Sequence, residues 1–130
     1  MKGKRILVAE DDVFMREFLQ ELLPRKGHRV DVVADGQQAI ESMRQTEYDL
    51  ILSDIQMPYV DGLQVLEKAL CMQPNTRVIL MSGDTAACRE EAKRRGAFDF
   101  IEKPFGVEVV EAKVELALMA TELQAQKLAS

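Results

Sequence analysis

Cysteine and histidine are scarce in this chain of 130 residues, which has two cysteines, Cys71 and Cys88, and one histidine, His28. The cysteines do not form a CxxC pair and one histidine cannot complete a zinc site, so neither zinc nor a disulfide framework is predicted. We expect both thiols to be reduced and partly buried. His28 follows Gly27 at the predicted end of a helix, where a solvated side chain without a catalytic role is expected.

Long apolar runs and an excess of positive charge are also absent. No apolar stretch approaches the ~20 residues that span a bilayer, and only four apolar residues separate the basic start from Glu10, too few for a signal peptide. We therefore expect a cytoplasmic protein with no membrane partner. The net charge of −5 argues against direct binding of nucleic acid.

The length and the composition are typical of one folded unit. The chain is 47% hydrophobic and 30% charged, as in ordinary globular proteins. A chain of this size can bury a core but is too short for two domains. We expect a single domain over residues 1–130, with its core at about residues 4–120.

Short β-like runs alternate with amphipathic stretches along the chain. Strands are predicted at Arg5–Ala9, Arg29–Val33, Leu50–Ser53, Arg77–Met81 and Phe98–Ile101. Helices are predicted around Phe14–Leu22 and at about Gly36–Gln45, Gly62–Met72, Thr85–Arg95 and Gly106–Leu128. This alternation predicts an α/β protein with a parallel sheet covered on both faces. Asp31 and Asp99 indicate that the second and fifth strands are edges, which favours the doubly wound, flavodoxin-like order 2-1-3-4-5.

Polar residues stand at the ends of four predicted strands. In chain order they are Glu10, Asp11 and Asp12, then Asp54, Ser82 and Lys103. Because the carboxyl ends of parallel strands share one edge of a sheet, these side chains should converge on one cleft. Crowded carboxylates repel one another, and a hard divalent cation such as Mg²⁺, or else Mn²⁺, relieves that repulsion. Asp12 is instead expected to cap the helix that follows it.

Asp54 is the predicted nucleophile of this cleft. A carboxylate can attack phosphorus and form an aspartyl phosphate once the negative charges of both groups are neutralised. Lys103 and the cation would supply the positive charge, and the Ser82 hydroxyl can donate to a phosphoryl oxygen. The residues themselves therefore predict a phosphoryl acceptor.

Four pieces of the sequence resemble the receiver domain of two-component response regulators. They are Ile6–Asp12, Asp54–Pro58 with Asp61-Gly62, Met81–Gly83 and Lys103–Phe105. The resemblance covers residue 4 to about residue 120. It implies phosphotransfer to Asp54 from a sensor histidine kinase or a phosphotransfer protein, and control of a downstream effector or output domain. It also implies a cis peptide bond between Lys103 and Pro104.

The same resemblance implies roles for single residues. The implied metal ligands are Glu10, Asp11, Asp54 and the backbone carbonyl oxygen of Gln56. Ser82 and Phe100 occupy the hydroxyl and aromatic positions of a switch that changes the surface of the fourth helix, fifth strand and fifth helix. Because Phe100 has no hydroxyl group, a partner would sense its ring by packing alone. Gln56 and Asp84 border the path of a hydrolytic water and are expected to set the lifetime of the phosphoryl group.

The final helix carries two apolar stripes. One is expected to pack on the sheet and consists of Val107, Val110, Val114, Leu118 and Thr121. The other has the spacing of a helix–helix seam and consists of Val109, Ala112, Leu116, Met119 and Leu123, which we call the heptad face. It predicts a homodimer, or a contact with a partner or output domain, through the fourth helix, fifth strand and fifth helix. The alternative is one wide stripe that covers the core.

Two other functions are compatible with the same fold. Phosphatases and phosphotransferases with an aspartate nucleophile usually have a second Asp two residues later, but that position is Gln56, which cannot act as a general acid. A flavin- or nucleotide-binding module would need a Gly- or hydroxyl-rich loop after the first strand, where this chain has three acids that would repel phosphate. We therefore expect a phosphoacceptor regulator that is not an enzyme.

Overall fold

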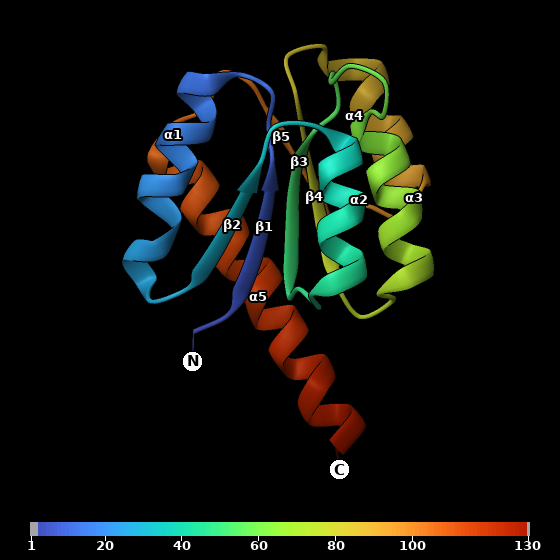
Figure 1. Cartoon of the computed structure of the whole chain (residues 1–130). Coiled ribbons are helices and arrows are strands. Elements are labelled where there is room, and N and C mark those ends of the chain that lie inside the picture. Colours follow the sequence, from blue (N-terminus) through green and yellow to red (C-terminus); the bar gives the residue numbers. More distant parts are fainter. Residues whose placement is uncertain (1–2, 130) are drawn as a thin grey trace.

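A five-stranded parallel sheet forms the centre of the computed structural model, which describes residues 3–129 (Figure 1). The strands are β1 (Arg5–Ala9), β2 (Arg29–Val33), β3 (Leu50–Asp54), β4 (Arg77–Ser82) and β5 (Asp99–Glu102). Their order is β2-β1-β3-β4-β5, which confirms the predicted doubly wound arrangement. β3 and β4 each extend one residue further than predicted, because Asp54 still pairs with Met81 and Ser82 with Glu102. β5 is displaced by one residue from its predicted bounds.

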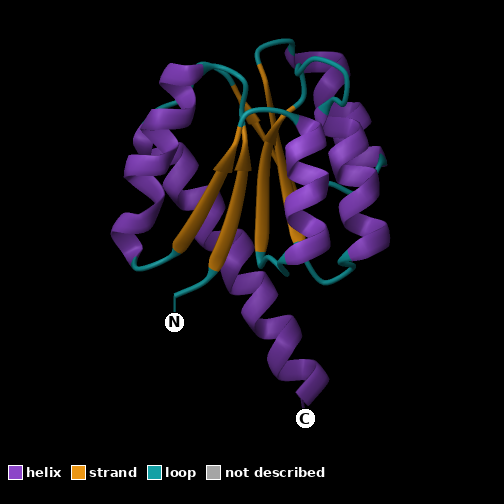
Figure 2. Cartoon of the chain, in the orientation of Figure 1, coloured by secondary structure: helices purple, strands orange, loops and turns teal. Residues whose placement is uncertain are grey.

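Five α-helices cover the two faces of the sheet (Figure 2). They are α1 (Val13–Leu22), α2 (Gly36–Gln45), α3 (Gly62–Met72), α4 (Thr85–Arg94) and α5 (Val107–Ala129). α1 and α5 lie on one face, while α2, α3 and α4 lie on the other (Figure 1). Within residues 3–129, no helix combines the length and the apolar character needed to cross a membrane.

Alternation of side chains along β1 divides the core into two layers. Ile6 and Val8 are buried against α1 and α5, whereas Leu7 and Ala9 face the side of α2 and α3. Successive residues of a strand point to opposite faces, so a strand covered on both faces must be apolar at every position. This is why the central strands read as continuous apolar runs in the sequence.

Aspartates at the carboxyl side of the sheet begin three of the helices. The side chains of Asp12, Asp35 and Asp61 accept hydrogen bonds from backbone N–H groups in the first turns of α1, α2 and α3, respectively. These bonds satisfy donors that a helix leaves without an internal partner. The predicted capping role of Asp12 is thereby confirmed, and its side chain is engaged in starting α1.

His28 is buried, contrary to the solvated position expected from the sequence. Its side chain is 4% exposed; Nδ1 accepts a hydrogen bond from the Lys4 backbone N–H at 3.1 Å, and Nε2 lies 2.9 Å from Glu115 Oε1. Gly27, with φ of 87°, turns the chain so that this ring lies beneath α5. Two other expectations were wrong: Cys71 is exposed, and Val107 is 38% exposed, with core packing beginning at Val110.

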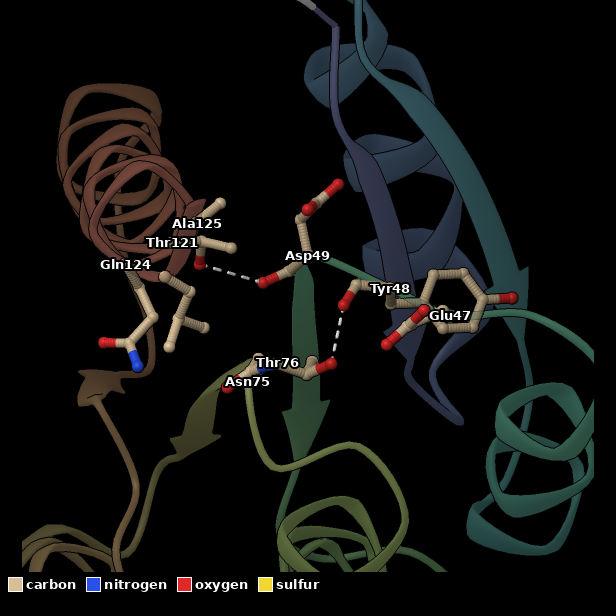
Figure 3. Close-up of a pocket in the computed structure, with 9 residues that line it drawn as sticks. Glu47, Tyr48, Asp49, Asn75, Thr76, Thr121, Gln124 and Ala125 are labelled. Atoms are coloured by element: carbon tan, nitrogen blue, oxygen red, sulfur yellow. Dashed lines mark hydrogen bonds between the residues drawn. The ribbon is translucent and has the colours of Figure 1, made fainter. Parts of the chain in front are cut away.

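The cavity drawn in Figure 3 lies at the other end of the sheet from Asp54, where β3 and β4 begin. It has a volume of about 510 Å³ and is closed on one side by α5. Thr121 Oγ1 lies 3.2 Å from the backbone oxygen of Asp49, and Thr76 Oγ1 donates to the backbone oxygen of Tyr48 at 2.6 Å (Figure 3). These bonds fasten α5 and the start of β4 to the segment that leads into β3.

Candidate functional site

The carboxyl ends of β1, β3, β4 and β5 bring the polar residues singled out in the sequence to one cleft. Glu10 directly follows β1, Asp54 ends β3, Ser82 ends β4 and Lys103 directly follows β5. The strands are neighbours in this order, and Ala9 is in register with Ser53 while Asp54 is in register with Met81. The apolar strands therefore carry a charged cluster at one edge of the sheet.

Three carboxylates form the acidic part of the cleft. One carboxylate oxygen from each of Glu10, Asp11 and Asp54 lies within 4.8 Å of the other two. Glu10 is completely buried, Asp54 is 5% exposed and Asp11 faces solvent. A cation held here would thus have buried ligands on one side and water on the other. An all-oxygen donor set fits Mg²⁺, which keeps part of its water shell, and does not fit zinc.

Lys103 crosses the cleft and contacts two of the carboxylates. Its Nζ lies 3.0 and 3.1 Å from the two Glu10 oxygens and 3.3 Å from Asp54 Oδ2. The Lys103–Pro104 peptide bond is cis, as the resemblance implied. The close pairing of Lys103 with Glu10 was missed in the sequence, where Lys103 was expected to serve the phosphoryl group.

Burial and mutual repulsion disturb the ionisation of the cluster. Burial raises the pKa of Glu10, and the neighbouring charge of Asp54 raises it further, although Lys103 opposes both effects. Burial also raises the pKa of Asp54 against the opposing effect of Lys103. Burial alone would lower the pKa of Lys103, but its hydrogen bond to Glu10 and the charge of Asp54 raise it above the ordinary value. One lysine therefore does not fully compensate the carboxylates, and further positive charge would stabilise the site.

Ser82 is buried at the cleft and hydrogen-bonded to Gln56. Its Oγ donates to Gln56 Oε1 at 2.8 Å and accepts from the Asp84 backbone N–H at 3.0 Å. Gln56 Nε2 in turn lies 3.8 Å from Cys88 Sγ on α4. Gln56 and Asp84 were expected beside the cleft from the sequence, but their hydrogen bonds to the Ser82 hydroxyl were not anticipated.

Phe100 lies on β5 and is 4% exposed. The guanidinium carbon of Arg89, on α4, lies 4.9 Å from the centre of the Phe100 ring. Arg89 Nη2 also lies 3.6 Å from Glu102 Oε2. The ring is therefore linked to charged groups of α4 by a cation–π contact, in addition to the packing expected from the sequence. No local sequence pattern signalled this pair.

Fold and site together define the class to which this chain belongs. The family model of the response regulator receiver domain matches residues 6–115, and the chain belongs to that family. It is a receiver domain of the kind found in two-component systems, whose role is to accept phosphoryl groups in signalling.

Individual relatives agree with this assignment. The chemotaxis protein CheY of Thermotoga maritima is 35% identical over 105 residues, which cover 79% of this chain and 88% of that protein. The transcriptional regulatory protein ZraR of Klebsiella oxytoca is 35% identical over 129 residues, 95% of this chain but only 28% of that protein. A crystal structure of the receiver domain of sensor histidine kinase PA1611 from Pseudomonas aeruginosa, with magnesium coordinated in its active-site cleft, superposes with a TM-score of 0.81. Its identity is 26%, and the match covers 89% of this chain and 98% of that one.

Proposed function

We propose that Asp54 accepts a phosphoryl group from a phosphohistidine of a sensor histidine kinase or phosphotransfer protein. The observation that carries this proposal is the position of Asp54, which is nearly buried and lies beside two further carboxylates and a lysine. Glu10, Asp11, Asp54 and the Gln56 carbonyl oxygen would hold Mg²⁺, or Mn²⁺ in its place. When bound, the cation would neutralise charge on the phosphoryl oxygens. The receiver domain of PA1611, which has magnesium coordinated in its active-site cleft, supports a cation at this position.

In the proposed step, an Asp54 carboxylate oxygen attacks the phosphorus atom of the donor. A phosphorus–oxygen bond forms, the phosphorus–nitrogen bond breaks, and the imidazole nitrogen keeps the electron pair of the broken bond. Lys103, which now contacts Glu10 and Asp54, can turn its Nζ to a phosphoryl oxygen because it carries three N–H donors. The carboxylate thereby becomes an aspartyl phosphate with its charge compensated.

The switch would follow from the loss of one hydrogen bond. Ser82 would leave Gln56 Oε1 and donate to a phosphoryl oxygen, and the Phe100 ring would move into the space that Ser82 vacates. Arg89 lies on that ring, so the surface of α4, β5 and α5 would change with it. A downstream effector or output domain would bind this surface in one state only. Gln56 and Asp84 would determine how long the phosphoryl group persists.

The wider setting follows from the same proposal. Residues 1–130 would form one receiver domain that works in the cytoplasm and does not itself contact nucleic acid or a membrane. It would regulate a partner and would not turn over a substrate, because Gln56 stands where an aspartate phosphatase needs a general acid. The relatives named a transcriptional regulatory protein and a chemotaxis protein support transcription or chemotaxis as the output.

Mass spectrometry after incubation with acetyl phosphate and Mg²⁺ tests the proposal. We expect a base-labile gain of one phosphoryl group that is absent from Asp54→Asn. Asp11→Asn should lose most of the Mg²⁺ dependence, whereas Asp12→Asn should retain it, because Asp12 caps α1 and asparagine caps equally well. A gain that persists in Asp54→Asn, no gain at all, or sustained turnover of a small phosphomonoester would contradict the proposal.

A further inference from the structure

α5 is longer than the sheet on which it packs. Its 23 residues span about 34 Å, whereas the six residues of β4 span about 20 Å. The last buried residue of the described part of the helix is Thr121, which contacts Asp49 near the start of β3 (Figure 3). Beyond it the helix projects past the end of the sheet (Figure 1). A projecting helix has no core of its own to stabilise it.

The heptad face lies on the opposite side of α5 from the core. Its large residues Val109, Leu116, Met119 and Leu123 are 46%, 56%, 50% and 63% exposed, and Ala112 is also exposed. The buried residues are Val110, Val114, Ala117, Leu118 and Thr121. Leu116 is two positions from both Val114 and Leu118, a rotation of about 200° around the helix. The face is therefore a second apolar stripe and not the margin of the first one, which rules out the single wide stripe considered above.

We propose that a second copy of this chain covers the heptad face by forming a parallel coiled coil with α5. The charged residues on either side of the heptad face favour a second α5 helix as the partner, and they favour the parallel orientation of that helix. One flank consists of Glu108, Glu115 and Glu122, and the other of Lys113, Ala120 and Lys127. In a parallel pair, each residue of the first flank faces the residue five positions later in the other helix. Glu108 then meets Lys113 of the second copy, and Glu122 meets Lys127.

An antiparallel pair would bring each flank against itself. Glutamates would face glutamates and lysines would face lysines, so the charges beside the seam would repel. The chain thus complements a second copy of itself in one direction only. The two C-terminal ends of α5 would lie side by side.

The contacts inside the chain are consistent with this pairing. Glu115 is the one acid whose counterpart, Ala120, has no charge, and its carboxylate is already bonded to His28 at 2.9 Å. Glu122 contacts Lys4, and Lys113 contacts Asp99 at 3.0 Å. A carboxylate has two oxygens and an ammonium group three N–H donors, so both can bond the second copy as well.

The basic residues of α4 are a weaker choice for a dimer contact. Arg89 contacts Phe100 and Glu102, while Arg94 and Arg95 both contact Glu91. These contacts balance the charge of Arg89, Arg94 and Arg95 within one chain. Unlike the charges of α5, those of α4 do not flank an exposed apolar stripe among the residues that the structure describes.

Sedimentation of the whole chain tests the dimer. Wild type should approach twice the monomer mass as its concentration rises, and Leu116→Glu should remain monomeric. Leu128→Glu is the matched control, because Leu128 is 66% exposed but lies outside the heptad face; it should associate like wild type. A monomeric wild type at the highest soluble concentration, or equal dissociation of both variants, would overturn the proposal.

Oxidative cross-linking tests the direction. In a background with the exposed Cys71 changed to Ser, Met119→Cys should form a disulfide-linked dimer quickly, because residue 119 faces itself in a parallel pair. Leu128→Cys should form little. Cross-linking of Val109→Cys only with Leu123→Cys would show an antiparallel pair instead. Acetyl phosphate labelling of Leu116→Glu should equal that of wild type, so a failure of the dimer is distinguishable from a failure of Asp54 phosphorylation.

Discussion

At the scale of single residues, the hydrogen bond between Ser82 and Gln56 opposes the proposed switch. The Ser82 hydroxyl has one proton to donate, and the shorter of its two acceptor contacts is to Gln56 Oε1 at 2.8 Å, against 3.4 Å to the Asp84 backbone oxygen. A phosphoryl group on Asp54 must replace Gln56 as its acceptor. On the proposed mechanism, the side chain at position 56 therefore influences how readily the phosphorylated arrangement forms.

Gln56→Ala should strengthen binding of a phosphoryl analogue such as beryllofluoride. The variant lacks the competing acceptor, so the unliganded state loses one hydrogen bond worth about 1 kcal/mol, which corresponds to roughly fivefold tighter binding. Titration followed by the fluorescence of an attached dye or by calorimetry would measure the change.

A double-mutant cycle with Ser82→Ala tests whether the tighter binding of beryllofluoride by Gln56→Ala comes from the lost hydrogen bond to Ser82. In the Ser82→Ala background there is no hydroxyl to release, so Gln56→Ala should leave the affinity unchanged. An equal gain in both backgrounds would show that Gln56 acts independently of Ser82.

At the scale of elements, the start of α3 holds the end of β3 in place. A Cβ atom added to Gly62 would lie 2.3 Å from the Asp54 backbone oxygen and 2.8 Å from Ile55 Cα. Asp61 and Gln64 form a reciprocal pair of hydrogen bonds that fixes the same turn. The position of the Asp54 carboxylate thus depends on a close approach that only glycine allows.

Gly62→Ala should lower the free energy of unfolding by about 2 kcal/mol, in the range found when a side chain is forced into a filled space. Because the clash is with the Asp54 backbone, Mg²⁺ affinity should fall as well. Urea unfolding and calorimetric titration would measure the two effects.

Gly106→Ala is the control for this change. An added Cβ at Gly106 meets nothing within 4 Å, so both stability and Mg²⁺ binding should stay close to wild type. If the two variants behave alike, the effect at position 62 does not come from contact with Asp54.

The elements themselves were largely predictable from the sequence. The bounds of β1 and β2 agree with the prediction to the residue, because apolar runs and flanking turn residues mark them clearly. The burial of His28 was not predictable. It depends on where α5 crosses the start of β2, and His28 and Glu115 are 87 positions apart.

At the scale of the whole molecule, the charge cluster links stability to pH. Burial raises the pKa of Glu10 and of Asp54 above their ordinary values of 4.5 and 3.8. A carboxyl group with a higher pKa in the folded chain than in the unfolded chain favours folding below its ordinary pKa. That contribution is lost as the pH rises through the raised value. The metal-free protein therefore loses this contribution as the pH rises above the ordinary values of the two carboxyl groups.

Asp54→Asn should stabilise the metal-free protein at neutral pH, on the order of 1 kcal/mol. Asparagine stays uncharged, and Lys103 keeps its contacts with Glu10. The difference should shrink as the pH falls to about 4, because the aspartate of wild type is then increasingly protonated in both the folded and the unfolded chain. Urea unfolding of both proteins across this pH range, with a chelator present, would measure the difference in stability.

In saturating Mg²⁺, wild type should become more stable than Asp54→Asn. A cation that binds only the folded state stabilises it by about 2.7 kcal/mol at one hundred times its dissociation constant, and wild type should bind it more tightly than Asp54→Asn. If wild type gains nothing from Mg²⁺, the three carboxylates do not form a metal site.

The sequence by itself determined the fold class and which residues lie at the cleft. Parallel strands bring their carboxyl ends to one edge of the sheet, whatever the conformation of the connecting segments. Tertiary structure alone decided which of those groups touch. Lys103 meets Glu10 across 93 positions of sequence and Gln56 meets Ser82 across 26. Such contacts depend on side-chain rotamers and on how the helices pack over the sheet, and no local pattern of residue types encodes either.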